Sequence, residues 1–341
     1  MRTLPPSMHS RIWVRYLLWA ESKGGSTTVA VYRRYLSVDP SVTERYTSLL
    51  LAQENAAPRP LEAAKLLLSL ARKGAKGEYT SPEGKSPYQL LCEWLEVVEQ
   101  YAEEVGLDVD ETVESNAAIA AAKGQEEAAA QQPPEPAKVD GHLIRFAGPA
   151  VAVDGDGKAL PPYDEDVDPT STRKLNIEYI IKNDGLEVYK DQAGRLWTGL
   201  GTYWIKRGEF DRAKATFEDG MASVLTIRDF TQIFDAYAEF SESLISAMME
   251  NIANPDDDED EEDVKETEAE LDAKMKEFEE LMDRRPFLVN DVLLRRNPND
   301  VQEWEKRVAL WGENDEKARM LNDLRRCMNI LTRLAGGRNI H

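Results

Sequence analysis

The sequence holds only two cysteines and three histidines in 341 residues, and this scarcity excludes several familiar kinds of site. Cys92 and Cys327 lie far apart, which fits reduced thiols in an intracellular protein better than a disulfide framework. Structural zinc sites need clustered cysteine and histidine ligands, and the sequence contains no such cluster. We therefore expect no metal site.

Long hydrophobic runs are missing as well. No apolar stretch approaches the roughly 20 residues that a membrane-spanning helix needs, and the first ten residues lack the apolar segment of a signal peptide. A P-loop, a Rossmann fingerprint and a nucleophile paired with a base are also absent. These absences predict a protein that binds no cofactor, does not enter a membrane and is not an enzyme.

Basic residues are outnumbered, with 42 Lys and Arg against 63 Asp and Glu, and the formal net charge is -21. Nucleic-acid binding depends on clustered cations against phosphates, so we expect RNA contact to be indirect or local at most. Part of the charge lies in the run Asp256 to Asp263, where like charges repel and favour a solvated loop. The run could also hold a basic tail of a partner, but it lacks the glycine and the spaced oxygens of a calcium-binding loop.

Helical periodicity with large aromatic residues is what the sequence does have. The segment from Leu196 to Ser223 shows it best, with a glycine, Gly208, between two apolar faces. Trp197, Leu200, Tyr203 and Trp204 share the first face, and Ala213, Phe217 and Met221 share the second. This order is close to the tetratricopeptide signature. It predicts a helical hairpin in which Ala213 permits close approach, while Trp197 and Phe217 fill the gap.

Similar patterns recur along the chain and predict further hairpins of an all-α solenoid. The residues that we expect in the repeat core are Trp13, Tyr16, Trp19, Trp197, Tyr203, Ala213, Phe217, Phe234, Tyr237 and Trp304. A platform for stacking bases is the alternative, but it would need exposed Arg or Lys beside the rings. Glu21 and Glu242 each follow an aromatic residue singly, which favours hydrogen bonding within a repeat over acid catalysis.

Composition divides the chain into three parts. Residues 1–105 and 174–341 carry the helical patterns, and the second of these parts includes an acidic loop at 255–263. Residues 106–173 are rich in Ala, Glu, Gln, Gly and Pro and have few large apolar side chains. Such a segment cannot bury enough surface to offset its ordering entropy, so we expect a flexible, disordered insert between the repeats.

Five arginines stand out near two expected turns, and they are the candidate partner-binding residues: Arg284, Arg285, Arg295, Arg296 and Arg307. Two interpretations remain open. They can pair with acidic neighbours, or they can present an edge that binds phosphate or carboxylate groups, which the guanidinium fork contacts with two hydrogen bonds.

Four runs carry a specific resemblance: Arg228 to Tyr237 (RDFTQIFDAY), Arg284 to Asn290 (RRPFLVN), Val292 to Pro298 (VLLRRNP) and Trp304 to Leu310 (WEKRVAL). They resemble the Syf family of pre-mRNA splicing factors, also called XPA-binding proteins, which are built from HAT (half-a-TPR) repeats. The resemblance covers about residues 175–310. Residues 1–105 match more loosely, and the expected insert does not match.

The resemblance implies a HAT/TPR-like solenoid in the nucleus, acting as a scaffold of the spliceosome's Prp-nineteen-associated complex. It further implies contacts with a HAT-repeat protein of the Crooked-neck kind and with the intron-binding helicase, and a link to transcription-coupled repair. The alternative is a generic tetratricopeptide-type adaptor that clamps a peptide in its groove, and it depends on the central hairpin alone.

Overall fold

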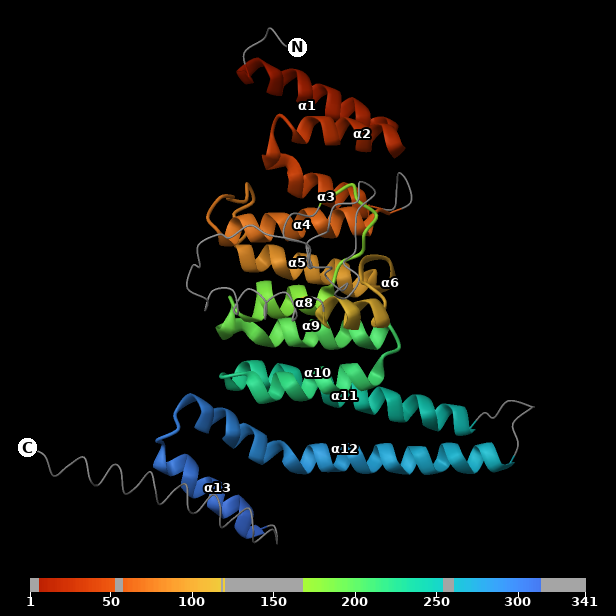
Figure 1. Ribbon diagram of the computed structural model, residues 1–341, viewed down its shortest axis with the longest axis vertical. Helices are drawn as coiled ribbons and strands as arrows, with labels where there is room; N and C mark the ends of the chain where they lie inside the picture. Colours follow the sequence, from red (N-terminus) through yellow and green to blue (C-terminus); the bar gives the residue numbers. More distant parts are fainter. Residues whose placement is uncertain (1–5, 53–57, 118, 120–167, 254–260, 314–341) are drawn as a thin grey trace, which may run out of the picture. The chain divides into compact units, whose positions relative to one another are not determined.

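The computed structural model describes residues 6–52, 58–117, 119, 168–253 and 261–313 (Figure 1). These residues are overwhelmingly helical, and within them strand-like pairing is confined to one isolated parallel bridge between Gly106 and Leu175. The all-α solenoid of helical hairpins predicted from the sequence is confirmed. The chain divides into two compact units, Met1–Gly185 and Leu186–His341.

The first unit is built from paired helices, drawn in red to yellow in Figure 1. They are α1 (Pro6–Lys23), α2 (Gly25–Leu36), the 3-10 turn η1 (Pro40–Val42), α3 (Thr43–Leu51), α4 (Pro60–Ala75), α5 (Pro87–Gln100) and α6 (Ala102–Val105). α1 packs on α2, α3 on α4, and α4 on α5. Gly24 and Gly25 join the first pair with φ of 67° and 66°, in the left-handed region that glycine adopts without steric cost.

The α4–α5 pair shows why the sequence folds as hairpins. Ser86 begins α5 with a capping box, in which its hydroxyl accepts from the backbone of Gln89 and the Gln89 side chain accepts from the backbone of Ser86. Small residues on α4, Ala63 and Ala64, are fully buried, as is the large Trp94 of α5. Small side chains on one helix and large ones on the other let the two axes approach closely.

Both ends of the segment predicted to be an insert belong to the first unit. Residues 109–117 are helical, and the backbone N–H of Leu175 donates to the carbonyl of Val105 at 2.8 Å. Val105 and Leu175 are fully buried, so these flanking residues supply the apolar burial that the rest of the segment lacks. Residues 118 and 120–167, which form most of the expected insert, lie outside the described residues.

The segment from Leu175 to Lys190 is not one continuous helix. A short α8 (Ile177–Ile180) continues as a π-helical turn, η2 (Ile181–Leu186). Ile180 and Ile181 are buried, and Asp184 forms an ion pair with Arg72 of α4 at 2.7 Å. This pair fixes the turn to the first unit.

The second unit continues with η3 (Lys190–Gln192), α9 (Ala193–Lys206), α10 (Phe210–Ser223), α11 (Ile227–Ala253), α12 (Glu261–Arg296) and α13 (Val301–Glu313). α9 packs on α10, α11 packs on both, α12 packs on α11, and α13 packs on α12. Gly208 turns the chain between α9 and α10 with φ 77°, as the glycine in the sequence predicts. The expected helix from Ala318 to Leu334 lies outside the described residues.

Glycines set the closest approaches in this unit. A Cβ on Gly201 of α9 would lie inside contact distance of the Phe217 ring on α10, with Cε2 only 3.0 Å away. A Cβ on Gly220 of α10 would lie 3.1 Å from Cγ of Trp197 on α9. Each helix therefore places a glycine under an aromatic ring of the other. Ala213 is fully buried, but the close approach of α9 and α10 that was predicted from Ala213 depends also on these two glycines.

α12 is the longest helix among the described residues. It begins at Glu261, inside the expected acidic loop, and continues through Pro286 to Arg296. Proline has no N–H to donate to the carbonyl of Met282, and Figure 1 shows the helix changing direction along its length. The remaining loop residues, 254–260, lie outside the described part. α13 then begins after Asp300, whose carboxylate accepts from the backbone of Gln302 at 3.1 Å.

Candidate functional site

The five candidate arginines lie at the joint of α10, α11, α12 and α13, but most of them are engaged there. Arg295 donates three hydrogen bonds of 2.6–2.8 Å to the carbonyls of Met221, Ala222 and Val224. α10 ends at Ser223, and the last carbonyls of a helix have no partner within it. Arg295 supplies those partners. Burial lowers the pKa of Arg295, while the nearby Asp291 acts in the opposite direction.

Arg284 and Arg285 lie within α12 and not at a turn. Arg284 forms an ion pair with Glu218 of α10 at 2.6 Å. The guanidinium of Arg285 lies 4.8 Å from the ring centroid of Phe234 on α11, close enough for a cation–π contact, and 3.6 Å from the carboxylate of Asp235. Both arginines therefore tie α12 to the preceding helices.

Arg307 fastens α13 to α12. It donates to the carbonyl of Phe287 at 2.9 Å and pairs with Asp291 at 2.9 Å. Its guanidinium also lies over the rings of Phe287 and Trp311, which contact each other with centroids 4.5 Å apart. Only 14% of the Arg307 side chain is exposed, so it is a part of the joint and not of an edge.

Arg284, Arg285 and Arg296 are exposed, and of these three only Arg296 has no ion pair or hydrogen bond with the described residues. Partner binding by these arginines stays a prediction, and Arg296 is the one whose side chain is not engaged within the described residues. The acceptors of Arg284, Arg285 and Arg295 lie on or just after α10 and on α11, where no local sequence pattern reveals them.

Most of the residues expected in the repeat core are buried, but two of them are not. Trp13, Trp197, Tyr203, Ala213, Phe217, Phe234, Tyr237 and Trp304 are each at most 8% exposed. Tyr16 is half-buried, and its ring stacks on Trp19 at 5.6 Å. Trp19 itself is 48% exposed and does not lie in the core, which is a correction. Six residues beyond Trp13, it points away from the buried face, which Leu17 and Ala20 occupy instead.

The half-buried Glu21 and the buried Glu62 form a second set of contacts in the first unit. Glu21 accepts from the hydroxyl of Tyr32 and pairs with Arg45 at 2.8 Å. Glu62 repeats this arrangement with the hydroxyl of Tyr46 and with Arg33 at 2.7 Å. Glu21 thus makes hydrogen bonds within the repeats, as predicted, whereas Glu242 is exposed. The sequence analysis gave no role to Glu62, although Arg59, three residues earlier, is within reach for an ion pair.

These contacts change the pKa of both tyrosines. Burial, and then the hydrogen bond to a carboxylate, raises the pKa of Tyr32 and of Tyr46. Both hydroxyls therefore stay protonated and donate to Glu21 and Glu62. We attribute these raised pKa values to the packing of the helices, because each carboxylate already binds a tyrosine and an arginine.

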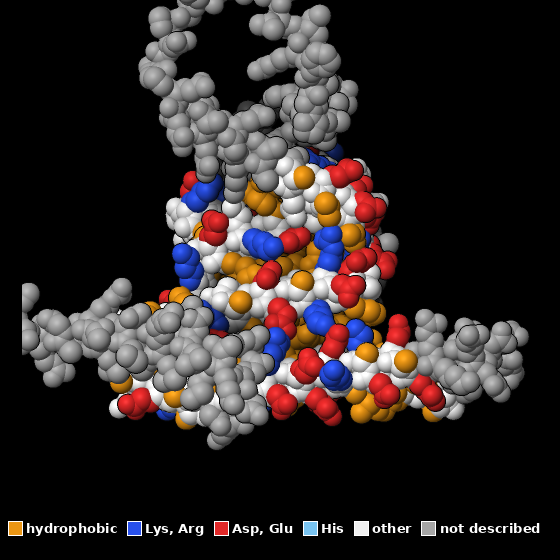
Figure 2. Space-filling view, turned by 60° about the horizontal axis from the view of Figure 1, so that its bottom comes forward, with side chains coloured by type: hydrophobic (Ala, Val, Ile, Leu, Met, Phe, Trp, Pro, Cys, Tyr) orange, Lys and Arg blue, Asp and Glu red, His pale blue; other side chains and the backbone are white. Residues whose placement is uncertain are grey.

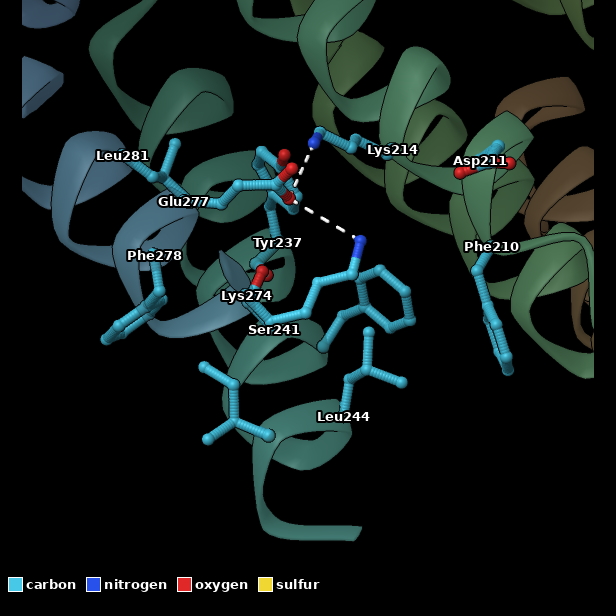
Figure 3. Close-up of a pocket in the computed structure, with 12 residues that line it drawn as sticks. Phe210, Asp211, Lys214, Tyr237, Ser241, Leu244, Lys274, Glu277, Phe278 and Leu281 are labelled. Atoms are coloured by element: carbon cyan, nitrogen blue, oxygen red, sulfur yellow. Dashed lines mark hydrogen bonds and ion pairs between the residues drawn. The ribbon is translucent and has the colours of Figure 1, made fainter. Parts of the chain in front are cut away.

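A small hollow lies between α10, α11 and α12 (Figure 3). Phe210, Phe240 and Leu244 are among its apolar lining residues. The ammonium groups of Lys214 and Lys274 lie 2.8 and 3.6 Å from one carboxylate oxygen of Glu277. The ion pair with Lys214 lowers the pKa of Glu277. The hollow holds only about 40 Å³, far less than the roughly 300 Å³ of a small-molecule pocket.

The first unit has a wider hollow of about 830 Å³ beside α2 and α4. The chain itself borders it through Asp168, Pro169 and Thr170. The buried Lys65 donates to the carbonyl of Ser171 at 2.8 Å and holds this segment in place. Charged side chains at this hollow therefore bind one another and the returning chain.

Among the described residues, no group of three or more His, Cys, Asp or Glu side chains is placed to hold a metal ion. Nor is any helix in this part of the chain long and apolar enough to cross a membrane.

Comparison with known proteins gives consistent matches. A family described as the middle HAT repeat of pre-mRNA-splicing factor SYF1 matches residues 163–322. The chain is 50% identical to Pre-mRNA-splicing factor SYF1 of Mycosarcoma maydis, over 93% of this chain and 31% of that protein. It is 38% identical to the protein of that name in Pyricularia oryzae (92% and 29%) and 32% identical to that of Homo sapiens (91% and 27%). The chain therefore spans less than a third of the length of these curated relatives.

Proposed function

Because the chain belongs to the SYF1 family of HAT-repeat pre-mRNA splicing factors, we propose that it is a scaffold that acts in the spliceosome through protein–protein contacts. The observation that carries this proposal is the joint of the second unit. Its contacts come from the four runs that resemble the family, through residues such as Phe234, Arg295 and Arg307. Residues that resemble the family thus build a rigid joint of stacked helices, which suits a scaffold.

The finer details follow from the family resemblance. The scaffold would work in the nucleus, as part of the Prp-nineteen-associated complex. Its protein partners would be a HAT-repeat protein of the Crooked-neck kind and the intron-binding helicase, and a role in transcription-coupled repair would follow from the same resemblance. The net charge of -21 supports protein partners over direct RNA binding.

The competing function is a peptide-clamping adaptor, which needs a groove that is open to a foreign peptide. The hollow of the first unit is bordered by the chain's own Asp168 to Thr170, and the hollow of the second unit is too small for a peptide. The small volume of the second hollow supports the scaffold. The sequence holds no motif that pairs a nucleophile with a base, and we propose no enzymatic reaction.

Affinity purification of the tagged protein from nuclear extract tests the proposal, with and without ribonuclease. A scaffold should enrich spliceosomal proteins together with small nuclear RNAs, and its protein partners should remain after ribonuclease treatment. Enrichment of chaperones or of one peptide-bearing client would support the adaptor. Loss of every protein partner after ribonuclease treatment would show that RNA mediates the association, against the proposal.

A further inference from the structure

α11 and α12 form a two-helix arm that runs beyond α10. The ring of Phe210, the first residue of α10, contacts the ring of Phe240 with centroids 5.8 Å apart. α11 continues from there to Ala253, which adds 13 residues or about 20 Å of helix. Figure 1 shows α12 running beside this extension. Beyond α10, no other helix described in the second unit therefore covers the sides of the arm.

Hydrophobic side chains line one side of this arm. On α12, Leu271, Met275, Phe278 and Met282 recur at spacings of four, three and four residues, which places them in one stripe. Met275 and Met282 are 38% and 40% exposed, while Leu271 and Phe278 are half-buried. On α11, Met249 is 44% exposed, and Ile245, four residues earlier, is half-buried. We call these six residues the methionine stripe.

The two halves of the stripe lie on the same side. On each helix the stripe includes half-buried residues that face the other helix, such as Ile245 on α11 and Leu271 on α12. Four residues later, Met249 and Met275 are each rotated outward from these in the same sense about the helix axis. Since α11 and α12 are consecutive, antiparallel helices, equal rotation brings both halves to one side of the arm. The result is a shallow apolar strip between two helices, which is the kind of surface that an amphipathic helix occupies.

Carboxylates flank the stripe. Glu268, Asp272 and Glu279 are exposed next to it on α12, and Glu242 is exposed next to it on α11. None of the four has an ion pair or hydrogen bond with the described residues. The nearby lysines are already engaged, because Lys274 pairs with Glu277 and Lys276 with Glu280. On the face seen in Figure 2, acidic side chains gather along the lower edge with hydrophobic patches among them.

We propose that the methionine stripe binds an amphipathic helix of a partner protein, whose apolar face covers the methionines and whose Lys and Arg residues pair with the flanking carboxylates. Methionine suits this role because its unbranched, polarizable side chain adapts to different apolar shapes. The charge of the rim excludes nucleic acid and selects a basic helix over an acidic one. This inference rests on the arm's own residues and not on the family assignment.

Fluorescence anisotropy of synthetic peptides with the full 341-residue chain tests it. The probe is a labelled 14-residue amphipathic peptide of Leu and Lys, designed on the length of the arm. One comparison peptide has Glu in place of every Lys, and another has the same Leu and Lys composition in an order without helical amphipathicity. The proposal expects the amphipathic Lys peptide to bind at least tenfold more tightly than either, with affinity that falls as salt rises.

Variants locate the site. Asp272→Lys with Glu279→Lys should weaken binding at least tenfold, and Met275→Gln with Met282→Gln at least fivefold. The charge-matched control, Glu96→Lys with Asp219→Lys, changes exposed acids outside the stripe and should leave affinity within twofold. Equal loss in the control would mean general attraction to an acidic protein and would overturn the proposal. So would equal binding of the Glu peptide, or unchanged binding by both stripe variants. Because the readout is direct binding, it does not depend on splicing activity.

Discussion

Gly201 of α9 lies directly against the ring of Phe217 on α10, with no room for a methyl group between them. Replacing Gly201 by Ala should therefore force the two helices apart. Overpacking of this kind costs typically about 1–3 kcal/mol, which outweighs the gain of up to about 1 kcal/mol in helix propensity. We expect a lower midpoint in urea denaturation for Gly201→Ala.

A double-mutant cycle separates this clash from a general effect of the substitution. In a Phe217→Leu background the side chain opposite Gly201 is smaller, so Gly201→Ala should cost less than in the native chain. Equal costs in the two backgrounds would contradict the contact.

Trp197 and Trp19 provide a matched pair of tryptophans with different environments. Trp197 is 7% exposed between α9 and α10, whereas Trp19 is 48% exposed on α1. Trp197→Ala should destabilise the chain by about 3–5 kcal/mol through lost burial and a cavity. Trp19→Ala should cost less than about 1 kcal/mol, as is usual at exposed sites. Thermal melting of both variants tests this, and similar melting temperatures would refute the assignment.

Arg295 and Arg296 are neighbours with opposite roles. Arg295→Ala removes three donors from the end of α10, and we expect a loss of about 1–3 kcal/mol. Hydrogen exchange should become faster in the last turn of α10. Arg296→Ala should change stability by less than about 0.5 kcal/mol.

The two arginine variants also test what remains of the predicted edge. If Arg296 contacts a spliceosomal partner, Arg296→Ala should reduce co-purification while melting stays unchanged. Undiminished co-purification would remove Arg296 from the candidate partner-binding residues.

Alkaline pH should weaken the fold through its buried tyrosines. Burial, assisted by the nearby Glu218, raises the pKa of Tyr237 to about 12, from about 10 in an unfolded chain. A raised folded-state pKa stabilises the fold fully below the unfolded value, and this stability is lost as pH rises from about 10 towards 12. Tyr32 and Tyr46 act in the same direction.

Urea denaturation at pH 8, 10 and 11 measures this effect. The native chain should lose stability between pH 10 and 11, and Tyr237→Phe should lose less because one of the responsible groups is gone. An identical pH dependence in the variant would contradict the role of Tyr237.

Much of the helical architecture could be predicted because periodicity is a local property. Trp197 and Phe234 recur with other apolar residues at helical spacing, and both are buried. Trp19 was placed wrongly by following a repeat pattern of aromatic residues, because the same spacing of six residues joins two buried rings, Trp197 and Tyr203, on α9. The helix α9 is covered by both α10 and α11, whereas α1 packs mainly on α2 and leaves Trp19 exposed.

What the sequence could not show are the contacts made between distant segments. An arginine next to a turn is typically exposed. The acceptors of Arg295, however, lie 71–74 residues earlier in the chain. Gly201 looked like an ordinary helical glycine until α10 placed Phe217 on it. Likewise, the acidic run suggested a loop up to Asp263, yet α12 begins at Glu261 and packs on α11.

The reciprocal glycine contacts of α9 and α10 also bear on the order in which the second unit folds. Gly201 and Phe217 are 16 residues apart, and Trp197 and Gly220 are 23 apart, so closing this hairpin requires only short loops. The contacts of Arg295 with the end of α10 close loops of more than 70 residues, which form more slowly. During synthesis the α9–α10 hairpin can therefore close before α12 has left the ribosome. Arg295 then joins the chain to a hairpin that already exists.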